Sequence, residues 1–366
     1  MSETLEQARQ FFQDGLAHSE AGRLEQAERC FAAALALAPG RPSVLTNLGA
    51  TRVRRGHWAD ALPLLEEALV AEPDNLEAWS YLGMAHAELG QMTPALQAFE
   101  RALAIDPRQT GLWSRRGSLL RELGRLSEAA ECFEQALALG ADPQLHGYYL
   151  ASVRDGAAPG VAPRAYVESL FDRYADEFQT HLVGALRYRA HEVLVRGLAP
   201  LGPQRFRSVL DLGCGTGLIG PLIKPMADRV DGVDLSSGML EQARACGSYT
   251  GLVHADAVDY LQSAGRRQYD LVLAADVFIY VGALDAVFAG AARVLAPGGL
   301  FGLSVELTAD AHDLRLLPSL RYAHSQAYVR RLAQEHGFEV RAAFRAPLRE
   351  EQQRPVEGLY VYLQGR

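Results

Sequence analysis

The stretch Val209-Leu-Asp-Leu-Gly-Cys-Gly-Thr-Gly217 decides the fold of the second half of this 366-residue chain. A short apolar strand over 208–212 leads into a loop with glycines at 213, 215 and 217, and the apolar segment 218–226 follows. Glycine tolerates backbone conformations with positive φ and leaves room for a ligand against the turn. The helix that follows such a turn offers free N–H groups. The stretch therefore predicts a ligand-binding strand–turn–helix unit.

The spacing of these glycines distinguishes between nucleotide ligands. The dinucleotide pattern G-x-G-x-x-G needs a glycine at position 218, where this chain has Leu218, so a nicotinamide-dependent oxidoreductase is disfavoured. The pattern present is G-x-G-x-G preceded by Asp211. It resembles the first motif of the class I S-adenosylmethionine-dependent methyltransferases. The resemblance implies that the glycine turn lies against the methionine part of S-adenosyl-L-methionine, which becomes S-adenosyl-L-homocysteine after the reaction.

Segments with strand and helix patterns alternate from residue 208 onward. We expect strands over 208–212, 229–234, 250–254, 269–275, 299–305, 338–345 and 358–363, and helices over 217–226, 237–246, 257–263, 283–295 and 325–336. Such alternation predicts a mostly parallel sheet with helices on both faces. The last two strands follow each other without a helix, which predicts a final antiparallel hairpin. A seven-stranded, mostly parallel α/β sheet of this Rossmann-like kind is the architecture of the methyltransferases that the chain resembles.

Acidic residues follow the predicted strands at the edge where open α/β sheets bind ligands. Asp234 ends the second strand, where a carboxylate can accept hydrogen bonds from two ribose hydroxyls. Asp256 and Ala257 follow the third strand, and the resemblance implies that they contact the adenine amino group. The full set of cofactor-binding residues that the resemblance implies is Asp211, Gly213, Gly215, Gly217, Asp234, Leu235, Met239, Asp256, Ala257, Ala274 and, from a covering helix, Tyr174.

The residues after the fourth strand carry the expectations about the methyl acceptor. Family members that methylate amino groups of nucleic acids or glutamine carry Asn/Asp-Pro-Pro-Tyr/Phe there, whereas this chain has Asp276-Val-Phe-Ile279. The departure disfavours those acceptors and favours small-molecule, carrier-bound or carboxylate acceptors. The residues expected to contact the substrate are Asp276, Tyr280, Arg321 and Tyr322.

Methyl transfer from a sulfonium is an in-line displacement, so the protein chiefly aligns the acceptor, removes a proton where necessary and excludes water. The candidate bases are His324, Tyr280, Glu306 and Asp276. His324 has a suitable ordinary pKa and follows Arg321 and Tyr322 on a predicted loop, although a solvent-facing loop residue would have the same pattern. A carboxylate acceptor would need no base, and Arg321 could bind it through two hydrogen bonds.

The first part of the chain repeats itself every 34 residues. The eighth position is always glycine, the twentieth and twenty-seventh are always alanine, and the twenty-fourth is Phe31, Leu65, Phe99 or Phe133. The pattern resembles the tetratricopeptide repeat, with units at about 8–41, 42–75, 76–109 and 110–143 and then a capping helix. Small residues let two antiparallel helices cross closely, and the bulky residue fills the space beside them. Such repeats stack into an all-α solenoid with a concave groove. Two interpretations of this groove stay open: it binds a protein or peptide partner, or it is a solvated surface without a ligand.

A Pro/Gly-rich segment over 155–163 predicts a linker between the solenoid, residues 1–154, and a methyltransferase domain, residues 164–366. Within that domain, 164–198 is expected to form two helices that cover the cofactor, with Tyr174 as a contact. This combination resembles a group of bacterial tetratricopeptide-containing methyltransferases.

Composition restricts the remaining possibilities. The first 143 residues carry 20 acidic and 13 basic side chains and the rest carry 24 and 23, which argues against a nucleic-acid partner. The four cysteines lack metal-ligand spacing, so no metal is expected. The first residues lack a signal-peptide pattern and no apolar run approaches membrane-spanning length, so a cytoplasmic protein without a membrane partner is expected.

The main hypothesis is an S-adenosylmethionine-dependent enzyme that methylates O or N of a small, carrier-bound or peptide-bound acceptor, with the solenoid recruiting or positioning substrate or partner. One alternative is an interaction scaffold whose methyltransferase-like domain is structural or senses the cofactor. Another is a protein or peptide methyltransferase.

Overall fold

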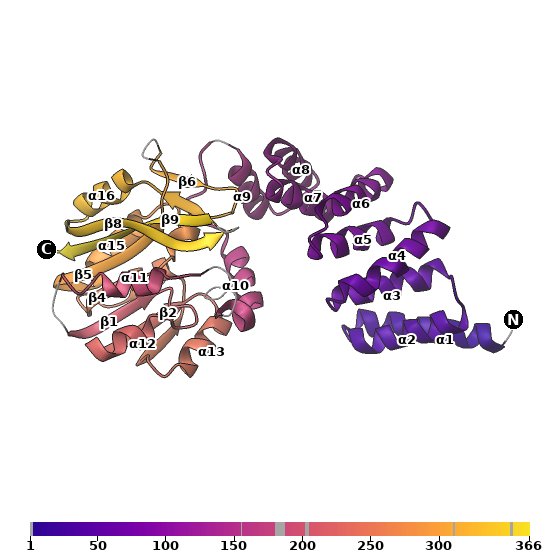
Figure 1. The fold of residues 1–366 in the computed structure, drawn as a ribbon, viewed down its shortest axis with the longest axis horizontal. Coiled ribbons are helices and arrows are strands. Elements are labelled where there is room, and N and C mark those ends of the chain that lie inside the picture. The colour runs from indigo at the N-terminus through magenta and orange to yellow at the C-terminus, as the bar shows by residue number, and fades with distance from the viewer. Residues whose placement is uncertain (1–2, 155, 180–186, 202–204, 310–311, 352–353) are drawn as a thin grey trace. The chain divides into compact units, whose positions relative to one another are not determined.

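A computed structural model describes residues 3–154, 156–179, 187–201, 205–309, 312–351 and 354–366, with side chains of 173–179 excepted (Figure 1). The chain forms two compact units, Met1–Arg154 and Asp155–Arg366. Each is described by itself below.

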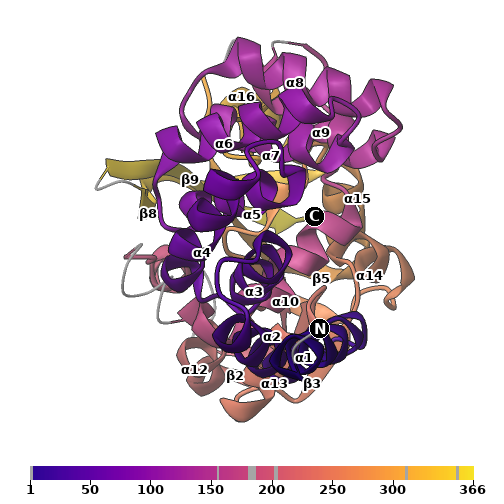
Figure 2. The ribbon, with the colours of Figure 1, turned by 90° about the vertical axis from the view of Figure 1, so that its right-hand side faces the viewer.

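The first unit consists of helices joined by short turns. Figures 1 and 2 show them as successive hairpins that stack side by side. The helices are α1 (Glu3–Glu20), α2 (Leu24–Leu37), α3 (Pro42–Arg54), α4 (Trp58–Ala71), α5 (Leu76–Glu88), α6 (Met92–Ile105), α7 (Thr110–Glu122), α8 (Leu126–Ala138) and α9 (Pro143–Val153). Within each hairpin the two helices pack on each other, and α9 packs on α7 and α8. The predicted all-helical solenoid is therefore confirmed.

Close helix crossings explain the glycine at the eighth position of each repeat. A Cβ atom on Gly83 would lie 2.6 Å from the ring of Phe99, and one on Gly117 would lie 2.7 Å from the ring of Phe133. The same contact joins Gly49 to Leu65 in the second repeat. The eighth and twenty-fourth positions are therefore coupled, because the absence of a side chain at one makes room for the bulk of the other.

The second unit is built on a sheet of seven strands among the described residues, in the order β3-β2-β1-β4-β5-β9-β8. The strands are β1 (Phe206–Leu212), β2 (Ala227–Asp234), β3 (Gly251–His254), β4 (Tyr269–Ala274), β5 (Leu295–Glu306), β8 (Phe338–Glu351) and β9 (Arg354–Gly365). Neighbours from β3 to β5 pair in parallel, and β9 is antiparallel to both β5 and β8. The predicted α/β fold with a final antiparallel strand is confirmed.

Helices cover both faces of this sheet because alternate strand residues point to opposite sides. Leu212, Val272 and Phe301 belong to a core that also contains residues of α15 (Asp285–Val294) and α16 (Gln326–Glu335). On the other face a second core joins Val209 of β1 and Leu271 and Leu273 of β4 to α11 (Ala190–Arg196) and α12 (Gly220–Ile223). The remaining helices are α10 (Arg164–Gln179), α13 (Ser237–Ala245) and α14 (Ala257–Ser263).

Two local predictions were wrong. The helix expected over 217–226 is shortened to α12 and a 3-10 turn, η2 (Lys224–Met226). Pro225 lacks the N–H that would continue the helical hydrogen-bond ladder, so the α-helix ends at Ile223. The predicted loop that carries Arg321, Tyr322 and His324 instead contributes β7 (Tyr322–His324), which pairs with β6 (Leu314–Leu316).

None of the described helices is both long and apolar enough to cross a bilayer.

Candidate functional site

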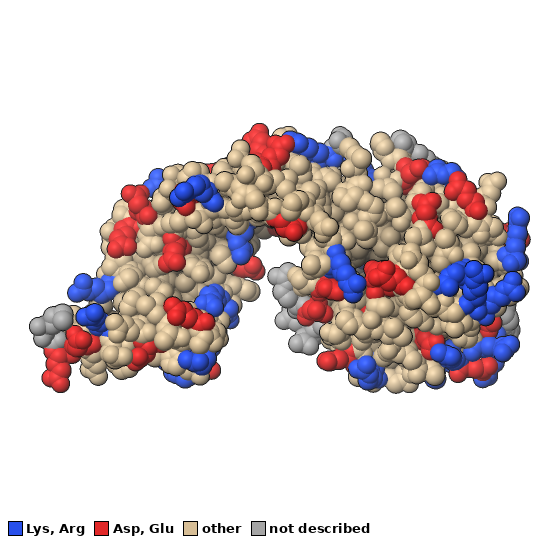
Figure 3. Space-filling model, turned by 180° about the vertical axis from the view of Figure 1, so that it is seen from behind, with Lys and Arg blue, Asp and Glu red and all other residues tan. Residues whose placement is uncertain are grey.

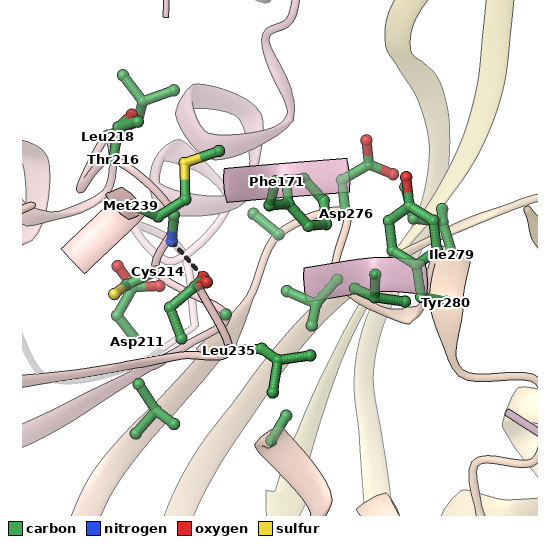
Figure 4. A pocket seen from close by; sticks show the side chains of 18 of the residues that line it. Phe171, Asp211, Cys214, Thr216, Leu218, Leu235, Met239, Asp276, Ile279 and Tyr280 are labelled. Carbon is green, nitrogen blue, oxygen red and sulfur yellow. Dashed lines mark hydrogen bonds between the residues drawn. The ribbon is translucent and has the colours of Figure 1, made fainter. Parts of the chain in front are cut away.

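A pocket of about 350 Å³ opens at the carboxyl ends of β1, β2, β3 and β4 and beside α10. Figure 4 shows two groups of its lining side chains. One group, here called the glycine-loop end, includes Asp211, Cys214 and Met239. The other, here called the Asp276 end, includes Phe171, Asp276 and Tyr280. The parallel strands place both groups at one edge because all four strands end there.

The glycine loop itself needs positive φ values, which are +71° at Gly213 and +53° at Gly215. A Cβ on Gly213 would lie 2.6 Å from Val277, so a side chain there would collide with the segment after β4. A Cβ on Gly215 would meet nothing within 4 Å, and Gly215 lines the pocket. The first of these glycines therefore makes room inside the protein, and the second leaves the pocket open.

Backbone N–H groups hold two of the predicted carboxylates. Asp234 accepts hydrogen bonds from the N–H of Gly215 at 2.8 Å and of Ser236 at 2.9 Å. Burial raises the pKa of Asp234 above its ordinary value, and these hydrogen bonds oppose the rise. Asp256 is the N-cap of α14, where its Oδ1 accepts from the N–H of Val258 at 2.8 Å. Both carboxylates are oriented before any ligand binds.

The third carboxylate, Asp211, is buried at the end of β1 and accepts a hydrogen bond from the hydroxyl of Tyr249 at 2.6 Å. Burial raises the pKa of Asp211 to about 7, and the Tyr249 hydrogen bond opposes the rise. Asp211 therefore changes charge close to neutral pH.

A buried arginine organises the Asp276 end. Nη1 of Arg349 donates to both carboxylate oxygens of Asp276, at 3.1 and 2.9 Å. Nη2 of Arg349 donates to Glu306 at 2.6 Å, and its Nε donates to Glu351 at 2.8 Å. Glu351 also pairs with Arg321. Burial raises the pKa of Asp276 and the ion pair with Arg349 opposes that rise. This carboxylate is therefore held in place by an ion-pair network.

Aromatic side chains form the apolar walls beside this network. Phe171 of α10 meets Tyr280 edge to face, with ring centroids 5.5 Å apart. Tyr188 donates its hydroxyl to the carbonyl of Ala275 at 3.2 Å and stacks on His191. Burial raises the pKa of Tyr280 to about 12, so its hydroxyl is protonated at neutral pH.

Most of the residues predicted for the site lie together in this pocket. Those that line it are Asp211, Gly213, Gly215, Asp234, Leu235, Met239, Asp256, Ala257, Asp276, Tyr280 and Arg321. Those that are not among its lining residues are Gly217, Ala274, Glu306, Tyr322 and His324. The side chain of Tyr174 lies outside the described residues.

The structure places the excluded residues in structural contacts. His324 is fully buried, and its Nε2 lies 3.0 and 2.9 Å from the carbonyl oxygens of Val281 and Gly282, to which it donates. Burial lowers the pKa of His324 to about 4. The hydroxyl of Tyr322 donates to the carbonyl of Pro159 at 2.6 Å. His324 is therefore not positioned to act as a base in the pocket.

The sequence reasoning missed Arg349 and Tyr249. Arg349 is 73 positions from Asp276 along the chain, and Tyr249 is 38 positions from Asp211, so no local spacing connects these pairs. Arg349 also lies beyond the end of the strand predicted over 338–345, whereas in the structure β8 continues to Glu351, so no predicted strand contained this residue.

Comparisons with known proteins agree with this geometry. Residues 209–299 match the family model described as a methyltransferase domain. Residues 46–110 and 111–142 match family models of the tetratricopeptide repeat. The first match spans the glycine loop and the strand ends that carry Asp234, Asp256 and Asp276.

Among curated proteins, methyltransferase-like protein 27 of Homo sapiens is 38% identical over 99 residues, which are 26% of this chain and 40% of the relative. Malonyl-[acyl-carrier protein] O-methyltransferase of Enterobacter lignolyticus is 32% identical over 157 residues, 43% of this chain and 57% of the relative. The chain thus spans about half the length of these relatives.

Among solved structures, 1,6-didemethyltoxoflavin-N1-methyltransferase of Burkholderia thailandensis, with bound S-adenosylhomocysteine, is 21% identical with a TM-score of 0.44 and covers 57% of this chain and 93% of that chain. By its family matches, the chain combines N-terminal tetratricopeptide repeats with a methyltransferase domain, and S-adenosylmethionine-dependent methyltransferases are among its homologues.

Proposed function

We propose that this protein transfers a methyl group from S-adenosyl-L-methionine to O or N of a small, carrier-bound or peptide-bound acceptor. The observation that carries the proposal is the convergence of Asp211, Asp234 and Asp256 with the glycine loop on one pocket, inside the region that matches the methyltransferase family. Carboxylates at successive strand ends suit a ligand that carries an ammonium, a ribose and an adenine.

The residues present fit that cofactor. Asp234 keeps lone pairs for the ribose hydroxyls after it has accepted from Gly215 and Ser236. Met239 and Ala257 line the same region and would contact the adenine, and Asp211 would receive the ammonium group. When bound, the cofactor supplies an activated methyl group, and these residues bind and orient it.

The Asp276 end would receive the acceptor. Phe171, Ile279 and Tyr280 offer apolar surface there, while Asp276 and Arg321 supply the polar contacts. Apolar walls with a few polar groups are typical of sites for small organic molecules. The high pKa of Tyr280 and the ion pairs of Asp276 favour an acceptor that loses its proton readily or carries none.

The repeats would recruit or position a substrate or partner. In the first unit a hollow of about 450 Å³ is lined by residues of α5, α6, α7 and α9, among them Ser114, Arg115 and His146. On the face shown in Figure 3, acidic and basic side chains are interspersed. A mixed surface of this kind suits a protein or peptide better than a phosphate backbone.

Calorimetric titration with S-adenosylhomocysteine tests the proposal. The wild-type protein is expected to bind it, and Asp234→Ala is expected to weaken binding by about 10- to 100-fold, because one or two charge-assisted hydrogen bonds are lost. Asp270→Ala is the matched control. Asp270 also accepts from two backbone N–H groups, those of Arg207 and Ser208, but it is not among the pocket-lining residues. Absence of binding by the wild-type protein would reject the proposal.

A scaffold without catalysis is the second candidate, favoured by the presence of the repeats. An assay with methyl-labelled cofactor, added together with the protein to a native lysate, distinguishes the enzyme from the scaffold. Label transfer that Asp234→Ala abolishes supports the enzyme, and label found only in low-mass material excludes a protein acceptor. A scaffold would transfer no label with either version.

A further inference from the structure

Tyr249 lies in the segment between α13 and β3, and its ring fills a space that three glycines leave open. A Cβ atom on Gly217, Gly220 or Gly232 would lie 3.0, 2.9 or 3.0 Å from a carbon of this ring. These glycines belong to the glycine loop, to the start of α12 and to β2. Three separate elements therefore leave room for the same aromatic ring.

This packing gives Gly217 a role other than the predicted contact with the cofactor. Its φ is +90°, and a side chain there would meet Tyr249, Cys246 and the backbone of Ala243. The third glycine of the motif thus faces α13 and the Tyr249 ring, which agrees with its absence from the pocket lining.

The position of the ring determines where its hydroxyl lies. The hydroxyl donates to Oδ2 of Asp211 at 2.6 Å. Asp211 is only 1% exposed, yet it lines the pocket at the glycine-loop end. A buried carboxylate needs hydrogen-bond donors to stay charged, and Tyr249 supplies one.

We propose that Tyr249 is a positioning residue of the cofactor site, whose hydroxyl keeps the Asp211 carboxylate ionised and oriented to receive the cofactor's ammonium group. The proposal rests on the proposed function, because it assigns to Tyr249 an effect on cofactor binding. Tyr249 itself is not among the residues that line the pocket.

The charges around Asp211 give the direction of the expected effect. The titratable groups that interact with this carboxylate are Tyr249, Asp234, Cys214 and Tyr188. Burial raises its pKa to about 7 and Asp234 adds to the rise, whereas the Tyr249 hydrogen bond lowers it. Loss of the hydroxyl therefore raises the pKa of Asp211, and at neutral pH a larger fraction of this carboxyl is protonated and unable to pair with an ammonium.

The test is the dissociation constant of S-adenosylhomocysteine for the wild-type protein and Tyr249→Phe between pH 6 and pH 9. We expect the variant to bind about five- to tenfold more weakly at pH 6 to 7, because a rise of about one unit in the pKa of Asp211 leaves about five- to tenfold less of its carboxylate ionised there. The ratio between the two proteins should fall toward one at pH 9, where Asp211 is ionised in both. Titration of the ligand's own amine is the same in both series and cancels from the ratio.

Tyr269→Phe is the matched control. Tyr269 is a buried tyrosine that donates to the buried Asp231 at 3.1 Å, but neither residue lines the pocket. This variant should bind with wild-type affinity at every pH. Combining Tyr249→Phe with Asp211→Asn tests whether Tyr249 acts through Asp211, since the effect of the tyrosine should disappear when Asp211 cannot ionise.

The outcomes are distinguishable. No binding by the wild-type protein at any pH rejects the proposed function. Binding by the wild-type protein together with an unchanged affinity and pH profile in Tyr249→Phe overturns the positioning role. A loss of affinity that is independent of pH and persists in the Asp211→Asn background also overturns it, because it would show that the ring only supports the fold.

Discussion

At the scale of single residues, burial changes the protonation of His324. Its imidazole sits at the end of β7 with Nε2 against two carbonyl oxygens, and its pKa is lowered to about 4. Below pH 6.5 an exposed histidine in the unfolded chain binds a proton that His324 in the folded protein excludes. His324 thus stabilises the fold most above pH 6.5, and the contribution is lost as the pH falls from 6.5 to 4.

We therefore expect acid to destabilise the second unit partly through His324. The drop from 6.5 to about 4 corresponds to about 3 kcal/mol of unfolding free energy lost over this range. In His324→Gln the unfolding free energy should fall less steeply with pH, as measured by urea denaturation followed by near-ultraviolet circular dichroism. His312→Gln, at an exposed position of the same unit, should keep the wild-type slope. Equal slopes in wild type and His324→Gln would contradict the assignment.

Residues whose role depends on local sequence could be predicted, and those whose role depends on a distant partner could not. Asp234 and Gly215 follow from the strand–turn–helix pattern and line the pocket together. Arg349 depends on partners in two other segments, and Tyr249 depends on space left by three glycines. Such contacts exist only after the sheet has assembled, so no spacing within the sequence indicates them.

At the scale of elements, the helical hairpins show the same amino acid serving opposite purposes. Gly83 lies where α5 meets the ring of Phe99, with no space for a methyl group. Gly147 lies within α9, and a Cβ there would meet nothing within 4 Å. The first glycine is required by packing, whereas the second only gives the unfolded chain extra freedom.

The same substitution should accordingly have opposite effects at these two sites. Gly83→Ala should destabilise the solenoid by about 1–3 kcal/mol through overpacking. Gly147→Ala should stabilise it by about 0.5–1 kcal/mol, because alanine favours the helix. Urea unfolding followed by tryptophan fluorescence measures both. Destabilisation by both variants would show that α9 also leaves no room for a side chain.

The helices and strands could be predicted where a sequence pattern extends over many residues. The 34-residue period fixed the helical hairpins, and the strands from 208 to 305 lie within a few residues of their predicted bounds, apart from an earlier start of β5 at Leu295. The errors fall at 217–226, where Pro225 stops the α-helix, at the segment before 325, and at the last two strands, which run to Glu351 and start at Arg354 rather than covering only 338–345 and 358–363. The β6–β7 pair is only three residues per strand, too short for an alternating pattern to be recognised.

At the scale of the whole molecule, the two units have separate cores and separate spectroscopic probes. The three tryptophans, Trp58, Trp79 and Trp113, all belong to the solenoid, and most tyrosines belong to the second unit. The proposed cofactor pocket lies in the second unit alone. A ligand that binds one unit stabilises that unit by an amount set by its concentration and affinity.

S-adenosylhomocysteine at about 100 times its dissociation constant should add about 2.7 kcal/mol to the stability of the second unit. For a unit of this size that is a rise of about 5–10 °C in its midpoint, which differential scanning calorimetry would detect. The midpoint of the solenoid's unfolding transition, followed by tryptophan fluorescence, should not change when the ligand is added. A parallel shift of both transitions would show that the units unfold together.

The placement of β9 between β5 and β8 has a consequence for biosynthesis. Each helical hairpin of the solenoid closes over neighbours in the chain, so it can form while translation continues. The edge of β5 that pairs with β9, by contrast, stays unpaired until β9, which ends at Gly365, has been synthesised. Until that strand leaves the ribosome, the nascent sheet exposes unpaired amides and apolar surface, and this interval is when the second unit is most open to aggregation and to chaperones.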